Sequence, residues 1–296
     1  MRITSKMIAN NLLSVVGRNR KLAADLQLDI ATTKKLRRPS DDPSGIVQVQ
    51  QYNVLVSRNE QYLRNISQIS GFMTDSMAAL DAITDRLQDA KALAVQGTSE
   101  TLDSTARAGL AKSVDELINS VVDLANSKYR NKYIFAGNKT STEAFTRSGD
   151  TVTYNGNSAK IQGKIGADTM VEYNKTGSEL FAPAGGVDIF AELIKLKQGL
   201  ENNDTEAIRA TIDTLGAAGK QVIDNTSSLG AIQNRLSLTE QMINNENINL
   251  ADKISKLQDT NMPEAIINSR ILQTAIESGL RTMSQTLQRS LVDFVQ

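Results

Sequence analysis

The chain contains no cysteine, no histidine and no tryptophan among its 296 residues. The absence of histidine and cysteine excludes imidazole acid–base catalysis, thiol nucleophiles, disulfides and the commonest ligands of transition metals. Carboxylates, lysine and tyrosine remain, and their positions form no recognisable catalytic constellation. The sequence therefore predicts a protein that is not an enzyme, with no catalytic residue, no bound metal and no cofactor.

The chain also lacks an excess of charge of either sign. It has 33 lysines and arginines and 33 acidic residues, so no global field attracts nucleic acid or a membrane surface. One basic run, Lys34, Lys35, Arg37 and Arg38, has no interleaved aromatic residues. We interpret it as the end of a helix, where the dipole favours cations, and not as a nucleic-acid site.

Long apolar runs are missing as well. No stretch approaches the roughly 18 uninterrupted apolar residues of a membrane-spanning helix, and the first eleven residues do not read as a cleavable signal peptide. We therefore expect no membrane insertion. A thiol-free composition suits export through an oxidising space, because wrong disulfides cannot form.

Apolar residues at heptad spacing are present at both ends of the chain. A three-to-four alternation places them on one narrow helical stripe, which is stable only when another helix covers it. Each terminus therefore resembles half of a coiled coil, and we predict that these stripes are subunit-assembly seams. The seam residues are Ile8, Leu12, Val15, Leu22, Leu26, Ile276, Leu280, Met283, Leu287, Leu291 and Phe294.

Between the termini the pattern predicts long helices. The first heptads run to about Leu36, before Pro39, and Asp42 followed by Pro43 favours a new helix start. Asp41 and Asp42 are expected to cap this helix rather than to bind a cation, since calcium loops need ligands at alternating positions. The second helix should break at Gly97, and Asp103 or Ser104 should cap a third.

A β-rich insert is predicted from residue 138 to residue 186. Thr151 to Tyr154 alternates, Asn155–Gly156 is a hairpin signal, and residues 159–165 should pair back. Met170 to Tyr173 suggests a further strand. Asp188 then favours a short helix, and Thr205 is expected to cap a long one that ends before Pro263.

These elements predict a mainly α protein. Its N- and C-terminal arms should form a long antiparallel helical bundle or coiled-coil rod that carries the small β-rich insert. The predicted parts are an N-terminal coiled-coil arm at 1–42, helical rod at 43–137, the insert at 138–186, returning rod at 187–262 and a C-terminal arm at 263–296.

Five segments resemble the bacterial flagellin family. They are Arg2-Ile3-Thr4, the junction from Pro39 to Gly45, the stretch from Leu93 to Gln96, the segment from Leu229 to Leu236, and the ending from Ile271 onward. Residues 131–137, followed by Thr140 and Phe145, are similar to the hook-associated members of this family rather than to its filament-forming members. The ending from Val292 to Gln296 also differs from common filament sequences.

The resemblance implies a secreted, extracellular structural subunit of the bacterial flagellum. It implies export by the flagellar type III apparatus with an export chaperone, and self-assembly through the terminal helices. A hook-associated member would join the hook to the filament, with another hook-associated protein below it and flagellin above it. No nucleic-acid partner is implied.

Two other functions remain open. The first is a filament flagellin, which should polymerise alone into long filaments. The second is a secreted coiled-coil tip or adhesin protein, in which the insert would contact a receptor.

Overall fold

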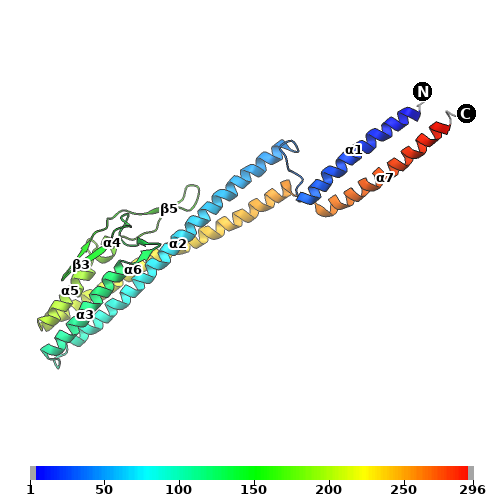
Figure 1. Ribbon diagram of the computed structural model, residues 1–296. Helices are drawn as coiled ribbons and strands as arrows, with labels where there is room; N and C mark the ends of the chain where they lie inside the picture. Colours follow the sequence, from blue (N-terminus) through cyan, green and yellow to red (C-terminus); the bar gives the residue numbers. More distant parts are fainter. Residues whose placement is uncertain (1–4, 293–296) are drawn as a thin grey trace. The chain divides into compact units, whose positions relative to one another are not determined.

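The computed structural model describes residues 5–292 and contains seven helices in that range. They are α1 (Ser5–Thr32), α2 (Pro43–Gly97), α3 (Ser104–Ala125), α4 (Gly177–Phe181), α5 (Ile189–Glu201), α6 (Thr205–Gln258) and α7 (Met262–Val292) (Figure 1). The strands are β1 (Lys128–Tyr129), β2 (Lys132–Tyr133), β3 (Phe145–Ser148), β4 (Thr151–Tyr154), β5 (Gln162–Lys164) and β6 (Met170–Glu172). The predicted mainly α class with a small β-rich insert is confirmed.

The chain divides into two compact units. Unit 1 takes residues up to Ser57 and from Glu246 onward, and unit 2 spans Arg58–Asn245. Both α2 and α6 begin in one unit and end in the other. The five-part division expected from the sequence is not tested by this grouping and stays a prediction.

Aspartates begin four of the described helices, α2, α3, α5 and α6. Asp103 accepts a hydrogen bond from the Ala106 amide at 2.7 Å, and Asp188 accepts one from the Ala191 amide at 3.0 Å. Both satisfy backbone donors that a first helical turn leaves unpaired. The expectation that Thr205 caps α6 is wrong, because Asp204 accepts from the Glu206 and Ala207 amides.

Unit 1 contains the antiparallel pair of α1 and α7 (Figure 1). The expectation that the first helix reaches Leu36 is wrong, since α1 ends at Thr32 and Thr33 has a φ of 57°. Residues 33–36 instead hydrogen-bond to residues 258–260: the Lys35 amide donates to the Gln258 carbonyl at 2.7 Å, and the Thr260 amide donates to the Thr33 carbonyl at 2.9 Å. Tertiary pairing of the two connections therefore ends the helix before proline does.

Unit 2 has one continuous apolar core. Met73, Leu80 and Ile83 of α2, Val114 and Ile118 of α3, and Leu215 and Leu229 of α6 are all at most 1% exposed. Their spacings of three, four, seven and fourteen residues put them on one face of each helix, as the sequence pattern predicts. Burial of so many aliphatic side chains stabilises this bundle, at roughly 1.5–3 kcal/mol for each fully buried one.

The β structure consists of three separate antiparallel hairpins, and the first of them, Lys128–Tyr133, precedes the insert expected at residues 138–186. β1 pairs with β2, β3 with β4, and β5 with β6. The predicted hairpin at Asn155–Gly156 is wrong, because β4 pairs back to β3 across Gly149, which has a φ of 60°, and Asp150. Gly156 instead lies against the ring of Tyr154, whose hydroxyl donates to the Asn157 carbonyl at 2.9 Å.

An aromatic cluster attaches the insert to the helices. Phe145 of β3, Phe181 of α4 and Phe190 of α5 are each at most 5% exposed, and the rings of Phe181 and Phe190 stack at 5.3 Å. The Asn126 side chain exchanges two hydrogen bonds with the Phe145 backbone, at 2.7 and 2.9 Å. The insert is therefore packed onto unit 2 and does not hang from it on a free linker.

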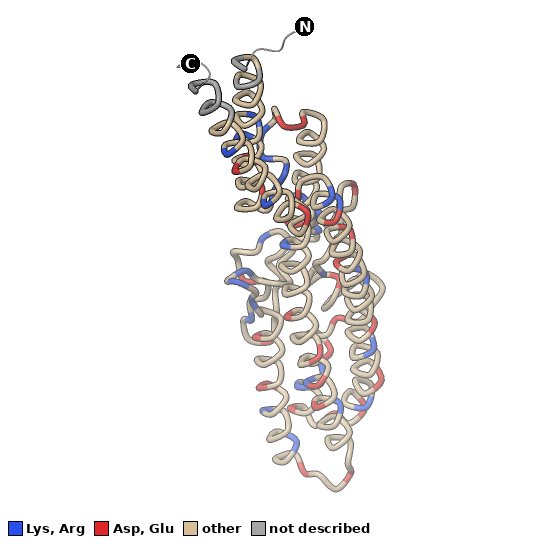
Figure 2. The backbone as a smooth tube through the Cα atoms, turned by 90° about the vertical axis from the view of Figure 1, so that its right-hand side faces the viewer, with Lys and Arg blue, Asp and Glu red and all other residues tan. Residues whose placement is uncertain are grey.

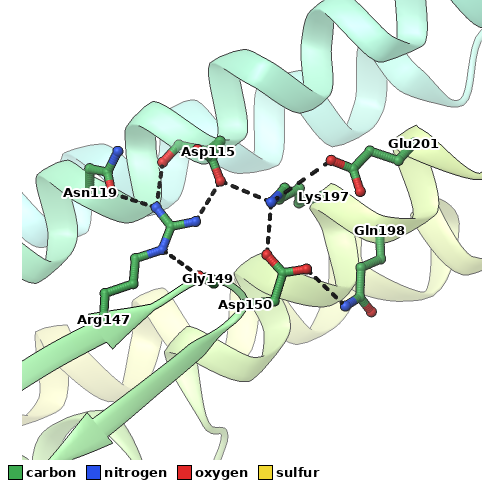
Figure 3. Close-up of polar contacts among 8 residues, drawn as sticks. All are labelled: Asp115, Asn119, Arg147, Gly149, Asp150, Lys197, Gln198 and Glu201. Carbon is green, nitrogen blue, oxygen red and sulfur yellow. Dashed lines mark hydrogen bonds and ion pairs between the residues drawn. The ribbon is translucent and has the colours of Figure 1, made fainter.

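A charged network fixes the tip of the β3–β4 hairpin between α3 and α5 (Figure 3). The Arg147 guanidinium donates to Asp115 and to the Gly149 carbonyl, and Lys197 lies 3.1 Å from Asp115 and 2.7 Å from Asp150. Hydrogen bonds from Arg147 and Lys197 hold the pKa of Asp115 below its usual range. Hydrogen bonds that Lys197 donates to Asp150 and Asp115 raise the pKa of its amine.

A buried arginine joins the turn that follows α2 to the turn that precedes α6. Arg107 is 5% exposed, and it donates to the Gly97 carbonyl at 2.9 Å and to the Ser99 carbonyl at 2.7 Å. It also donates to the Asn203 side chain at 2.5 Å. Three partners compensate the loss of hydration of this guanidinium.

Replacement of Arg107 by alanine should destabilise unit 2. Two turn carbonyls would lose their donor, and the free energy of unfolding should fall by about 2–4 kcal/mol. Arg209→Ala, on an exposed position of α6, is the matched control and should change it by about 0.5 kcal/mol or less. Urea unfolding followed by circular dichroism measures both, and equal losses in the two variants would contradict the assigned role.

The network around Asp115 should make stability depend on pH. The folded-state pKa values of Asp115 and Asp150 are lowered, so their contribution is present above the unfolded value of about 3.9 and is lost as the pH falls through the folded values. The melting temperature of Asp115→Asn should therefore lie below that of the native chain at neutral pH. The two should converge in strong acid, whereas Asp123→Asn, on an exposed position of α3, should follow the native chain throughout.

Candidate assembly surfaces

The contact between α1 and α7 is lined mainly by small and half-buried side chains. On α1 the fully buried members are Val16, 5% exposed, and Ala23, 6% exposed; on α7 they are Ala265 and Ser269. A side chain added at Gly279 would place its Cβ 3.0 Å from Val16 Cγ2. The less exposed positions follow three-to-four spacing on both helices: Leu12, Val16, Asn19, Ala23, Leu26 and Ile30, with Ala265, Ser269, Leu272, Ile276, Gly279 and Met283.

The predicted seam residues divide into two groups. Leu12, Leu26, Ile276 and Met283 lie half-buried in the α1–α7 contact. Val15, Leu22 and Leu280 are 39%, 50% and 39% exposed and lie beside the contact, not in it. The structure describes only the backbone of Ile8, Leu287 and Leu291. Phe294 lies outside the described residues 5–292. An assembly role of any of these residues stays a prediction.

Sequence reasoning missed the small members of the contact. Ala23, Ala265, Ser269 and Gly279 carry little hydrophobic signal, so a search for large apolar residues passes over them. Their three-to-four spacing in register with Leu12 and Leu26 was the available signal, because small residues let two helices approach closely.

Large apolar side chains of unit 1 face the solvent. Leu22 is 50% exposed, Ile267 is 59% exposed and Met7 is 55% exposed. The complete set on the described part of α1 and α7 is Met7, Leu13, Val15, Leu22, Leu28, Ile266, Ile267, Ile271 and Leu280. Exposed apolar surface on one pair of helices makes this pair a candidate for protein–protein contact.

The connection between α1 and α2 is held by local polar contacts. Asp41 accepts hydrogen bonds from the Arg38 and Arg37 amides at 2.8 and 3.1 Å, which lower its pKa, so the expectation that it caps α2 is wrong. Asp42 accepts from the Gly45 and Ser44 amides, which lower its pKa, so its predicted capping role is confirmed. The Arg37 guanidinium lies 2.9 Å from Asp29.

The basic run at residues 34–38 therefore lies after α1, not in its last turn. Lys35 donates through its amine to the Lys256 carbonyl at 3.1 Å, so this cation meets the C-terminus of α6. The favourable interaction of a cation with a helix C-terminus is therefore made with α6, and not with α1 as the sequence predicts.

Glycines of α6 do not bring another helix of this chain close. A Cβ at Gly219 or Gly230 would meet no atom within 4 Å, and at Gly216 it would meet only the Lys91 amine. Gly216 and Gly219 line a shallow groove of about 240 Å³ between α2 and α6, together with Leu87 and Ile223. The groove is too open and too poor in converging polar groups for a small-molecule site.

The charged residues of the described surface are mixed in sign. Lysines, arginines and acidic residues are interspersed along the helices (Figure 2). Within residues 5–292 no group of three or more acidic side chains is placed to hold a metal ion. In the same range no helix combines the length and the apolarity needed to cross a lipid bilayer.

Comparisons with known proteins agree with this arrangement. The model of the bacterial flagellin N-terminal helical region matches residues 3–140, and that of the C-terminal helical region matches residues 212–295. Flagellar hook-associated protein 3 of Salmonella typhimurium is 23% identical over 314 residues, which cover 98% of each chain. The flagellar filament 33 kDa core protein of Treponema phagedenis is 25% identical over 96% of this chain and 92% of its own length.

Solved structures share the fold. A flagellar hook-associated protein from Vibrio parahaemolyticus superimposes with a TM-score of 0.70 at 19% identity, over 74% of this chain and all of the other. The two family models together take in most of α1, α2, α3, α6 and α7, which are the helices of the two arms. The chain therefore belongs to the bacterial flagellin family, whose members are structural proteins of the flagellum.

Proposed function

We propose that the chain is a hook–filament junction subunit of the bacterial flagellum. It assembles with copies of itself through α1 and α7, and it connects another hook-associated protein below to the flagellin filament above. It would reach this extracellular position by flagellar type III export, with an export chaperone as its partner before assembly. The likeness to hook-associated protein 3 over 98% of both chains supports the junction role.

One observation carries the assembly role. The α1–α7 pair buries small side chains and leaves large ones, such as Leu22 and Ile267, in water. At roughly 25 cal/mol per Å² of apolar surface, covering such side chains is strongly favourable. Neighbouring copies stacked along a common axis would supply that cover, with Val15, Leu22 and Leu280 as candidate contacts.

A filament-forming role is the second candidate. The Treponema phagedenis filament protein matches this chain over a similar length at 25% identity, and its helical arms would assemble in the same way. The adhesin alternative has weaker support, because the β-rich insert is packed onto unit 2 through Phe145 and the Arg147 network rather than presented on a stalk.

Electron microscopy of hook ends should separate the two flagellar roles. Purified chain added to isolated hooks should form a short terminal zone that stops growing, and flagellin added afterwards should extend it into filaments. Growth of the chain alone into long filaments would instead identify a filament flagellin.

Cells that lack the chain should lose filaments and release flagellin into the medium. Normal swimming with lost attachment to host cells would favour the adhesin.

Substitutions on neighbouring faces of α1 should separate assembly from folding. Leu22→Glu places a charge on an exposed position and should leave the free energy of unfolding within about 0.5 kcal/mol of native, yet prevent addition to hook ends. Ala23→Glu places a carboxylate against α7 and should loosen the helix pair itself, since a buried unpaired charge costs several kcal/mol.

Lys21→Glu is the matched control, because Lys21 is exposed on the same turn and is not apolar. It should retain both stability and addition to hooks. Circular dichroism melting and electron microscopy give the two readouts. Unimpaired addition of Leu22→Glu would rule out this face of α1 as a subunit contact.

A further inference from the structure

The β1–β2 hairpin is built with a strained turn. Its two central residues, Arg130 and Asn131, have φ values of 47° and 64°. Asparagine tolerates this left-handed region, but arginine does so at a cost, and glycine is the usual choice in a two-residue turn. Strain of this kind persists where the surrounding structure imposes it, and it concentrates at functional positions.

The same hairpin gathers positive charge. Lys128, Arg130 and Lys132 fall within five residues of a chain whose net charge is zero. The Lys128 amine lies 4.4 Å from the ring centre of Tyr133, and the Arg130 guanidinium lies 5.4 Å from that of Tyr129. Throughout residues 5–292, none of the three cations forms an ion pair with a carboxylate.

The hairpin is held firmly on α2. The rings of Tyr129 and Phe72 meet edge-to-face at 5.9 Å, and Gly71 leaves the space that the Tyr129 hydroxyl occupies. The Tyr133 amide donates to the Thr140 carbonyl at 2.9 Å. A rigidly presented group of cations loses little conformational entropy when a partner binds it.

An exposed acidic face lies further along the same helix. Asp81, Asp85 and Asp89 are one helical turn apart and exposed, and the small side chains of Ala78 and Ala82 lie between or beside them. Asp89 pairs with Arg86 at 3.0 Å, but Asp81 and Asp85 form no ion pair in the described part of the chain. Small residues beside carboxylates allow a β-turn to approach the helix backbone.

The hairpin cannot contact the acidic face of its own copy. It is anchored at Gly71, and Asp81 and Asp85 lie 10 and 14 residues further along α2, which is about 15 and 21 Å at the helical rise of 1.5 Å per residue. A lysine side chain does not span either distance. The two complementary surfaces of one chain can therefore meet only between two copies.

We propose that the basic β1–β2 hairpin, Lys128–Tyr133, docks on the acidic face of α2 around Asp81 and Asp85 in a second copy of this chain. The contact joins two different surfaces, so it is heterologous and propagates from copy to copy. It lies in unit 2 and goes beyond the terminal helices as the means of assembly. It rests on the proposed function only in requiring copies to lie side by side.

Carbodiimide cross-linking of the native chain tests the contact, because this reagent joins a carboxylate to an amine only where the two touch. An equal mixture of ¹⁴N- and ¹⁵N-labelled chain, concentrated to its solubility limit, is treated, digested and analysed by mass spectrometry. Mixed-isotope links from Lys128 or Lys132 to Asp81 or Asp85 are expected, and about 0.5 M salt should suppress them.

The exposed Lys112 of α3 is the internal control in the same digest. Links from Lys128 and Lys132 should exceed those from Lys112 several-fold. Equal yields, absence of mixed-isotope links to Asp81 and Asp85, or links to other surfaces instead would each overturn the proposal. The isolated chain is used without hooks, so this result is independent of whether the junction role holds.

Charge exchange provides a second, independent readout. Lys128→Glu with Lys132→Glu should abolish the mixed-isotope links, and so should Asp81→Lys with Asp85→Lys. All four substitutions in one chain should restore them with acid and amine exchanged. Circular dichroism checks that each variant folds. Failure of the folded fourfold variant to regain the links would show that the charges do not meet across copies.

Discussion

Burial of apolar surface is the constraint on which the rest of this structure depends, and its two units meet that constraint differently. Unit 2 places Leu80, Ile118 and Leu229 inside, at most 1% exposed. Unit 1 places Ala23 and Gly279 inside its helix pair and Leu22 outside. A helix pair that leaves large side chains such as Leu22 in water keeps part of its hydrophobic free energy available for association.

The polar contacts divide in a corresponding way. In unit 2, Arg107 and the network of Arg147, Asp115 and Lys197 tie turns and the insert to the helical core. In unit 1, polar contacts cluster in the connections between α1 and α2 and between α6 and α7. They are the hydrogen bonds of Asp41 and Asp42 and the backbone pairing of residues 33–36 with 258–260. Polar contacts thus tie the turns and the insert to the core of unit 2. In unit 1 they join the connection that follows α1 to the one that precedes α7.

Helix positions were the most predictable part of the fold. The starts at Pro43 and after Asp103 and Asp188, and the break at Gly97, follow from capping chemistry that is local in sequence. Strand pairing was predicted less well. Asn155–Gly156 has the sequence of a hairpin turn, but Tyr154 and Asn157 use that segment for tertiary contacts, and Gly149–Asp150 makes the turn instead. Sequence reasoning predicted the half-buried Leu12 and Leu26 of the α1–α7 contact and missed its small members, and an assembly role of these helices stays a prediction.

The sequence by itself determined the mainly α class, the heptad stripes at both termini and the lack of side chains for thiol or imidazole chemistry, because periodicity, capping and composition are local properties. Only the tertiary structure decided which side of each stripe is covered within one chain, where α1 ends, and how the three hairpins pair. Those outcomes depend on contacts between residues far apart in the chain, such as Val16 with Gly279 and Thr33 with Thr260, whose competing energies no local pattern contains.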